Sequence, residues 1–205
     1  RTELGGLHSA KSMMVSVEFA EIEALQHQGR WDEAAKILID AACSLESGGA
    51  DFAIICTNTM HKLYDIIQQS IRIPLLHIAD ATAESINAQG IKKIALLGTR
   101  FTMEENFYKG RLVENYGLEV IIPSSEDMQI IHRIIYDELC AGMIKPESKQ
   151  KYMVIIRRLV KEGAEGIILG CTEIGLLVKQ DDSPVQLFNT AVIHAKAAVK
   201  YALAG

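Results

Sequence analysis

A short segment of this chain occurs twice, and the repeat restricts the fold to one built from two similar halves. Residues 49–59 read Gly-Ala-Asp, a short apolar run and then small polar residues, and residues 163–173 read Gly-Ala-Glu followed by the same kind of sequence. When both copies are aligned on the Gly-Ala-acid start, Cys171 falls opposite Thr57 and not opposite Cys56. Two such halves can offer one reactive group to each side of a single substrate atom. This geometry suits proton exchange at a stereocentre.

Short apolar runs alternate along the chain with segments of helical periodicity. The alternation predicts strands over residues 13–17, 52–56, 74–78, 93–97, 119–122, 167–169 and 185–188. The periodicity predicts helices over residues 31–47, 59–70, 79–89, 102–116, 125–139, 146–162 and 190–203. Alternating strands and helices are typical of parallel sheets with helices on both faces. The repeat therefore predicts an α/β fold of two pseudo-symmetric parallel-sheet lobes, with the active site in the cleft between them.

The repeat also predicts where the lobes begin and end. We expect an N-terminal lobe of residues 1–90 plus 189–205 and a C-terminal lobe of residues 91–188. The second lobe opens with a strand that runs into Gly98 and Thr99, but the sequence has no matching strand and helix before residue 1. By the logic of the repeat, we expect that a first strand and helix are missing from this sequence.

Composition excludes several classes of protein. The chain has 205 residues, 49% of them hydrophobic, and a formal net charge of -5 without a basic stripe, which argues against nucleic acid and anionic membranes as partners. The apolar runs are too short for a membrane span, and no signal-peptide pattern is present. The 4 cysteines are widely spaced, as in a reduced, cytoplasmic protein. No nucleotide-binding glycine motif occurs, and His61 and His77 lack metal-site spacing, so we expect no metal.

Two polar clusters follow buried strands, and both are candidates for the site. They are Thr57-Asn58-Thr59 and Cys171-Thr172-Glu173. Each is expected at the carboxyl end of a strand, where backbone N–H groups of the next helix can bind a carboxylate. Two anion sites would suit a substrate with two carboxylates. A cysteine at a helix N-terminus is expected to have a lowered pKa, and its thiolate can take a proton from carbon.

The identity of the second reactive group depends on the register of the repeat. Neighbouring side chains of a strand point to opposite faces, so a cleft-facing Cys171 predicts that Thr57 faces the cleft and Cys56 does not. Alternation can break near a strand end, and Cys56 therefore stays an alternative. The residues around Thr57 could also form only a helix N-cap, and Glu173 could be only an acidic residue of a first helical turn.

Three motifs resemble those of the aspartate/glutamate racemase family, whose members are cofactor-independent enzymes with two pseudo-symmetric α/β lobes. Residues 56–61, Cys-Thr-Asn-Thr-Met-His, resemble the family's Cys-Asn-Thr-x-His motif. Residues 170–175, Gly-Cys-Thr-Glu-Ile-Gly, resemble its Gly-Cys-Thr-Glu motif, and residues 77–82 match a third segment. The resemblance covers nearly the whole chain.

The resemblance implies a set of roles. In the family, one cysteine of each motif flanks the substrate α-carbon, and Cys171 matches the second cysteine. Thr57 stands where the first cysteine usually is, as in a subgroup that carries threonine there. A threonine hydroxyl is a poor base, so Thr57 would return a proton more easily than remove one. In the family the cysteine of the second lobe acts on the L-enantiomer, so L-aspartate or L-glutamate is expected to be the better substrate. The resemblance implies substrate contacts from Gln26, Thr57, Asn58, Thr59, Thr172 and Glu173, the last of them to the amino group.

The leading hypothesis is therefore a pyridoxal-independent racemase of aspartate or glutamate, acting by two-base proton transfer at the α-carbon without a cofactor. The resemblance also implies a homodimer. Two alternatives use the same scaffold: a hydantoin racemase, or a decarboxylase or isomerase of small dicarboxylic acids. A third alternative is a non-catalytic relative that binds an amino acid.

Overall fold

The computed structural model describes residues 3–204, and contacts divide these into two compact units. The first unit comprises residues up to Ile54, Leu63–Leu76 and residues from Val199 on, and the second comprises Ile55–Lys62 and His77–Ala198. Residues 55–62, 77–90 and 189–198, which the repeat places in the N-terminal lobe, belong by their contacts to the second unit. Lobes defined by a repeat and units defined by contacts are different divisions, so the lobe boundaries stay a prediction.

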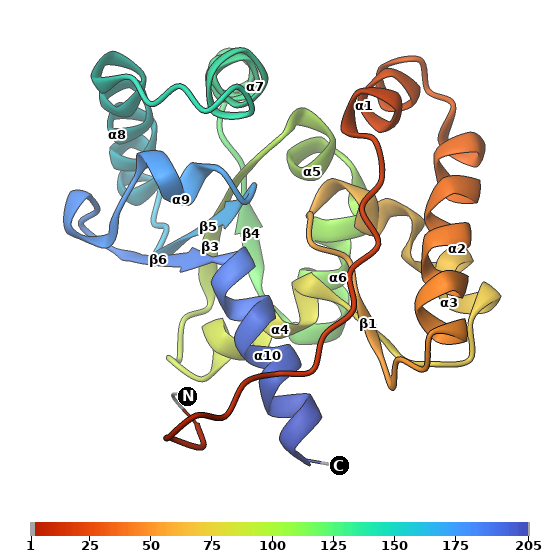
Figure 1. The fold of residues 1–205 in the computed structure, drawn as a ribbon. Coiled ribbons are helices and arrows are strands. Elements are labelled where there is room, and N and C mark those ends of the chain that lie inside the picture. Colours follow the sequence, from red (N-terminus) through yellow and green to blue (C-terminus); the bar gives the residue numbers. More distant parts are fainter. Residues whose placement is uncertain (1–2, 205) are drawn as a thin grey trace. The chain divides into compact units, whose positions relative to one another are not determined.

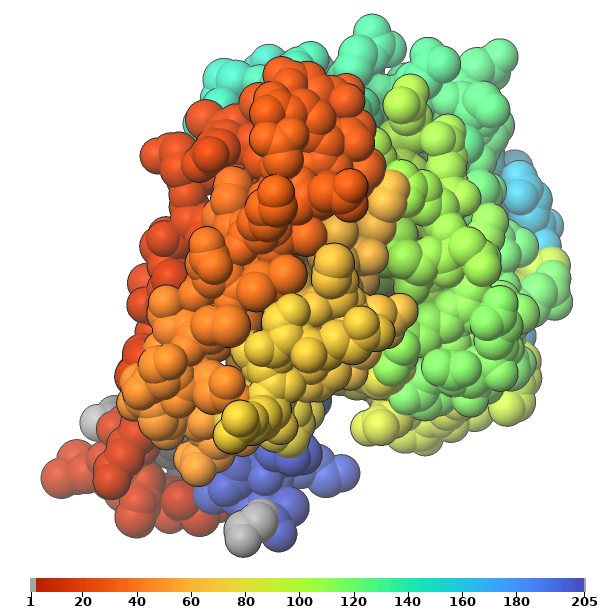
Figure 2. Space-filling view, turned by 90° about the vertical axis from the view of Figure 1, so that its right-hand side faces the viewer, coloured from red at the N-terminus to blue at the C-terminus, as the bar shows by residue number. Residues whose placement is uncertain are grey.

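The first unit contains a short parallel sheet and three helices. Its strands are β1 (Ala53–Ile54) and β2 (Leu75–Leu76), which pair in parallel. Its helices are α1 (Phe19–His27), α2 (Trp31–Ser47) and α3 (Tyr64–Ser70). The helix predicted over residues 31–47 is confirmed at both ends. Figure 2 shows the surfaces of α2 (orange) and α3 (yellow) side by side, as their contacts require.

The strand predicted over residues 13–17 is wrong. Residues 9–18 form no regular secondary structure, and Met13 and Met14 are 50% and 86% exposed. A strand needs a neighbour that pairs with its backbone N–H and C=O groups. No strand among the described residues pairs with this segment. Its apolar residues therefore gave a strand-like pattern without a sheet to join.

The second unit contains a parallel four-stranded sheet with strand order β4-β3-β5-β6. Its strands are β3 (Lys93–Gly98), β4 (Glu119–Ile121), β5 (Gly166–Gly170) and β6 (Gln186–Asn189). The two central strands are buried almost throughout, as expected for a parallel sheet covered on both faces. The predicted α/β fold with parallel sheets is thereby confirmed (Figure 1).

The helices of the second unit surround this sheet. They are α4 (Ile78–Asn87), α5 (Arg100–Glu104), α6 (Asn106–Tyr116), α7 (Ser125–Ile134), α8 (Pro146–Lys161), α9 (Ile174–Leu177) and most of α10 (Thr190–Ala204). The 3-10 helix η3 (Gln180–Asp182), the π-helix η2 (Ile135–Leu139) and all but the last residue of the 3-10 helix η1 (Thr59–Leu63) also belong to this unit. The helix predicted over residues 102–116 is broken at Glu105, whose backbone is extended. None of the helices described between residues 3 and 204 is long and apolar enough to cross a membrane.

Candidate functional site

The site begins at the edge where the central strands end. Gly98 of β3 pairs with Gly170 of β5, so Thr99 and Cys171 leave the sheet at the same level. A Cβ atom on Gly98 would lie 2.9 Å from the Gly170 carbonyl oxygen, which explains why both strands end in glycine. Thr190 follows β6 at this same edge, because Asn189 pairs with Leu169. The sheet register thus gathers polar residues from three turns.

Cys171, Thr172 and Glu173 form a compact hydrogen-bonded group directly after β5. The Cys171 thiol donates to Glu173 Oε2 over 3.0 Å, and the Thr172 hydroxyl donates to the same oxygen over 2.7 Å. Cys171 is 9% exposed, and the other two residues are half-buried. One carboxylate oxygen therefore accepts both protons, and Glu173 is placed to take the thiol proton.

The lowered pKa that the sequence predicts for Cys171 is wrong. Burial raises the pKa of this thiol well above its ordinary value, and the negative charge of Glu173 raises it further. The helix that follows, α9, has 4 residues, so it supplies little of the helix dipole that was expected to stabilise a thiolate. In this state Cys171 is a thiol that can give a proton. Forming the thiolate requires that its proton leave and that the charge of Glu173 be balanced.

The first motif contributes two buried residues, Thr59 and Asn58, to the same edge of the sheet, and Thr59 bonds to the turn after β3. Thr59 Oγ1 lies 3.1 Å from Thr99 Oγ1 and 3.4 Å from Thr102 Oγ1, and the latter two hydroxyls lie 3.2 Å apart. All three threonines are buried. This threonine cluster, Thr59, Thr99 and Thr102, fastens the first motif to the turn after β3.

Asn58 is connected to the strand that carries Cys171. Thr190 Oγ1 donates to the Leu169 carbonyl over 2.9 Å and accepts from Asn58 Nδ2 over 3.0 Å. A carbonyl can only accept, so the Thr190 proton points to Leu169 and the Asn58 amide must turn its NH₂ group to Thr190. The other amide atom, Asn58 Oδ1, is buried without a hydrogen-bond partner among the described residues. A buried acceptor of this kind can accept a hydrogen bond from a bound water or ligand.

His61 holds the backbone of Thr57. Its Nδ1 lies 2.8 Å from the Thr57 carbonyl oxygen, and its Nε2 accepts from the Ile78 N–H over 3.2 Å. His61 is 2% exposed, and its ring packs against the rings of His77 and His194. Burial lowers the pKa of His77 to about 3, aided by the positive charge of Arg111. Within residues 3–204, no group of His, Cys, Asp and Glu side chains is arranged to hold a metal ion.

The sequence-predicted residues therefore fall into two groups. The second unit contains Cys56, Thr57, Asn58, Thr59, Cys171, Thr172 and Glu173. Cys56 is exposed and Thr57 is half-buried, and neither observation decides which of them is the second reactive group, so this stays a prediction. Gln26 lies buried on α1 in the first unit, and its role at the site also stays a prediction.

Sequence reasoning missed the residues that support the motifs. Thr99 had a weak signal, because it follows a strand and a glycine, but Thr102 and Thr190 had none. Thr190 occupies the first position of a helix, where threonine is ordinary. Its role depends on strand order, which brings β6 next to β5. A single sequence does not reveal that neighbourhood.

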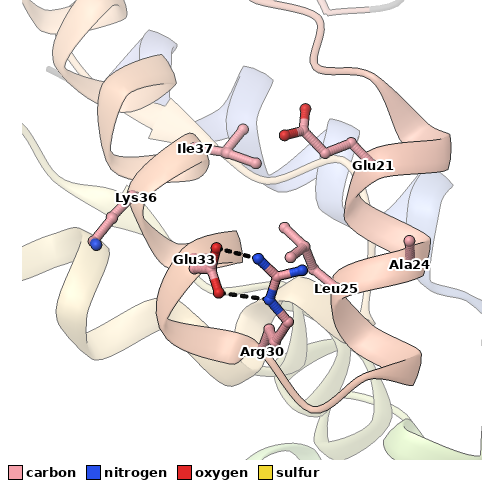
Figure 3. Close-up of a pocket in the computed structure, with 7 residues that line it drawn as sticks. All are labelled: Glu21, Ala24, Leu25, Arg30, Glu33, Lys36 and Ile37. Carbon is pink, nitrogen blue, oxygen red and sulfur yellow. Dashed lines mark hydrogen bonds and ion pairs between the residues drawn. The ribbon is translucent and has the colours of Figure 1, made fainter.

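A separate pocket of about 370 Å³ lies between α1 and α2 of the first unit (Figure 3). It is lined by Glu21, Ala24, Leu25, Arg30, Glu33, Lys36 and Ile37. The Arg30 guanidinium donates two hydrogen bonds to the Glu33 carboxylate, so these charges satisfy each other. None of the motif residues lines this pocket.

Comparisons with known proteins agree on one family. The model of the Asp/Glu/Hydantoin racemase family matches residues 2–198. The broad specificity amino-acid racemase RacX of Bacillus subtilis is 30% identical over 176 residues, which cover 84% of this chain and 74% of RacX. Among solved structures, the crystal structure of a candidate Asp/Glu racemase from Yersinia pestis is 54% identical in sequence. It superimposes with a TM-score of 0.91 and covers 98% of this chain and 88% of the Yersinia chain. An aspartate racemase homologue from Pyrococcus horikoshii OT3 is 37% identical, with a TM-score of 0.84 over 98% and 87% of the two chains.

Proposed function

The chain belongs to the Asp/Glu/hydantoin racemase family, and on this premise we propose that it is a pyridoxal-independent racemase of aspartate, glutamate or both. Membership makes it a protein of the isomerase type that acts on small amino-acid substrates. The substrate and the acid/base pair are our proposal. The observation that carries it is the group of Cys171, Thr172 and Glu173, which joins a thiol to a carboxylate that can exchange a proton with it.

Racemisation needs a proton removed from one face of the α-carbon and another returned to the opposite face. We assign removal from the L-enantiomer to Cys171 and return of a proton to Thr57. A hydroxyl is a weak base and a competent donor. The maximal rate at saturating substrate should therefore be higher for the L-enantiomer than for the D-enantiomer, with a KM higher by the same factor, because the equilibrium constant of racemisation is 1. Comparable maximal rates for the two enantiomers would contradict this assignment.

The polar groups of the site match the two ends of an amino acid. Asn58 Oδ1 and the Glu173 carboxylate are acceptors, and they suit the substrate ammonium group. The hydroxyls of Thr59 and Thr172 can donate to a carboxylate. An ammonium beside Glu173 would also offset the negative charge that raises the Cys171 pKa. Substrate binding would thus favour the thiolate that removes the α-proton.

Chiral chromatography of the products from L-aspartate and L-glutamate tests the proposal. The substrate panel should include non-acidic amino acids, because RacX is named for broad specificity. Cys171→Ser should reduce formation of the D-enantiomer by a factor of about 10² or more, as expected for loss of a general acid/base group. Thr57→Ala should reduce it similarly, whereas Cys56→Ala should leave it near the wild-type rate. A near-wild-type rate for Thr57→Ala together with a reduced rate for Cys56→Ala would instead assign return of the proton to Cys56.

Other outcomes would replace the proposal. Release of carbon dioxide from a small dicarboxylic acid would indicate a decarboxylase, and turnover of a hydantoin alone would indicate a hydantoin racemase. Binding of an amino acid without formation of the other enantiomer would indicate a non-catalytic relative. We also expect the protein to be a homodimer in solution. Light scattering of the same preparation measures the molar mass, which should be twice the 22.6 kDa of one chain.

A further inference from the structure

The His61 ring joins two backbone groups, and the chemistry of these groups fixes its proton. The Ile78 N–H can only donate, so His61 Nε2 must be an acceptor without a proton. The Thr57 carbonyl can only accept, so Nδ1 must carry the proton and donate it over 2.8 Å. His61 is therefore held as the neutral Nδ1–H form, because a doubly protonated ring would lose its bond from Ile78.

The surroundings of the ring prevent it from turning. The centroid of the His77 ring lies 4.6 Å from that of His61, and the centroid of the His194 ring lies 5.8 Å away. All three side chains are at most 5% exposed. His77 in turn accepts from the Ala79 N–H and caps α4. The orientation of His61 is thus set by packing as well as by its two hydrogen bonds.

This arrangement places the backbone of Thr57 but not its hydroxyl. Among the described residues no side chain binds the Thr57 hydroxyl, whereas Asn58 and Thr59 are anchored through their own side chains. The hydroxyl can be aimed only through the backbone that carries it. Within residues 3–204, the Thr57 carbonyl is the one group of that residue that a side chain binds, and His61 is that side chain.

We propose that His61 is a positioning residue for Thr57, which it holds where the hydroxyl returns a proton to the α-carbon. The inference rests on the proposed racemisation. His61 should affect only the return of a proton to the α-carbon, because Thr57 takes no part when Cys171 removes the α-proton. Loss of His61 should therefore slow inversion and spare abstraction.

A substrate that needs only abstraction separates the two halves. The compound is the 3-chloro derivative of L-aspartate or L-glutamate, whichever the enzyme racemises. When Cys171 removes its α-proton, the electron pair left on the α-carbon forms the Cα–Cβ double bond and chloride departs from Cβ. No second proton is required. Chloride release from this compound measures abstraction, and formation of the D-enantiomer from the ordinary L-amino acid measures the complete reaction. Their ratio does not depend on how much of a preparation is folded.

His61→Leu should lower the ratio of racemisation to chloride release by about 10- to 100-fold, the size expected for a misplaced reacting group. His61→Gln should restore much of the ratio, because its amide can also donate and accept. His77→Asn is the comparison: it removes part of the packing around His61 but leaves the His61 bonds to Thr57 and Ile78 and keeps an acceptor for the α4 cap, so its ratio should fall less than that of His61→Leu. If His61→Leu does not fold, His61→Asn replaces it with the same expectation, because its side chain is too short to bridge both groups.

The outcomes separate this inference from the function on which it rests. An unchanged ratio in His61→Leu or its replacement would overturn the positioning role while leaving the racemase intact. A fall in the ratio for His77→Asn equal to that of the His61 variants would also overturn it. Wild-type protein that neither racemises the amino acid nor releases chloride would instead overturn the proposed function.

Discussion

At the scale of single residues, Cys171 and Glu173 form the chemical centre of this account. The thiol donates to the carboxylate over 3.0 Å, and burial together with that negative charge raises the thiol pKa well above its ordinary value. The resting site therefore stores a proton on sulfur. Cys171 must lose this proton before it can remove the α-proton, and an ammonium group beside Glu173 would favour that loss.

Glu173→Gln should make Cys171 more reactive at neutral pH. The substitution removes a negative charge beside the thiol, so the thiol pKa falls and the thiolate fraction rises. The rate of alkylation of Cys171 by iodoacetamide, followed by mass spectrometry as a function of pH, measures this shift. Variants with Cys43, Cys56 and Cys140 replaced by serine provide the background. A midpoint that stays the same or rises in Glu173→Gln would show that the carboxylate does not control the thiol.

At the scale of elements, the close approach of β3 and β5 defines the edge on which the site is built. Gly98 and Gly170 pair at the ends of these strands, and a Cβ atom on Gly98 would meet backbone and the Thr102 side chain at 2.9–3.2 Å. The backbone cannot give way as a flexible side chain can. The glycines thus allow the threonine cluster to pack directly against the strand ends.

Gly98→Ala should lower the free energy of unfolding by about 1–3 kcal/mol, the usual cost of overpacking. Gly110→Ala is a matched control at a buried position of α6, where the three atoms nearest to the added Cβ all belong to the exposed side chain of Asn106. That side chain can move, and alanine favours a helix, so the control should be neutral or up to about 1 kcal/mol more stable. Urea unfolding of both variants measures the difference. Equal stability of Gly98→Ala and the wild type would contradict the close packing.

The elements also show what a single sequence can predict. The helix over residues 31–47 was predicted to the residue, because its apolar positions repeat with helical spacing and two glycines end it. The segment over residues 13–17 has a strand-like pattern but no strand to pair with, and pairing is a property of the whole sheet. The repeat predicts Cys171 and Thr57 as candidates for the site, and their roles stay predictions. Thr190 could not, because its role follows from the order of β5 and β6.

At the scale of the whole molecule, burial of neutral histidine couples stability to pH. Burial lowers the pKa of His77 to about 3 in the folded protein, from the ordinary histidine value of 6.5. Between these values the unfolded chain binds the proton and the folded chain does not, so stability falls as pH decreases from about 6.5 towards 3. The slope contributed by this one group is at most about 1.4 kcal/mol per pH unit.

Urea unfolding at a series of pH values between 7 and 4 measures this slope. His77→Asn keeps an acceptor at the α4 cap but does not titrate in this range, so its stability should fall less steeply with decreasing pH than that of the wild type. Parallel curves for the two proteins would mean that other groups cause the acid sensitivity.

The most direct test of the central claim is proton NMR of L-aspartate and L-glutamate in deuterated water. With the wild-type protein we predict loss of the α-proton signal of at least one of the two amino acids, because a proton removed from carbon is replaced by deuterium from the solvent. Cys171→Ala should leave that signal unchanged over the same period. Retention of the signal with the wild type, or its equal loss with Cys171→Ala, would contradict the assignment of α-proton transfer to this cysteine.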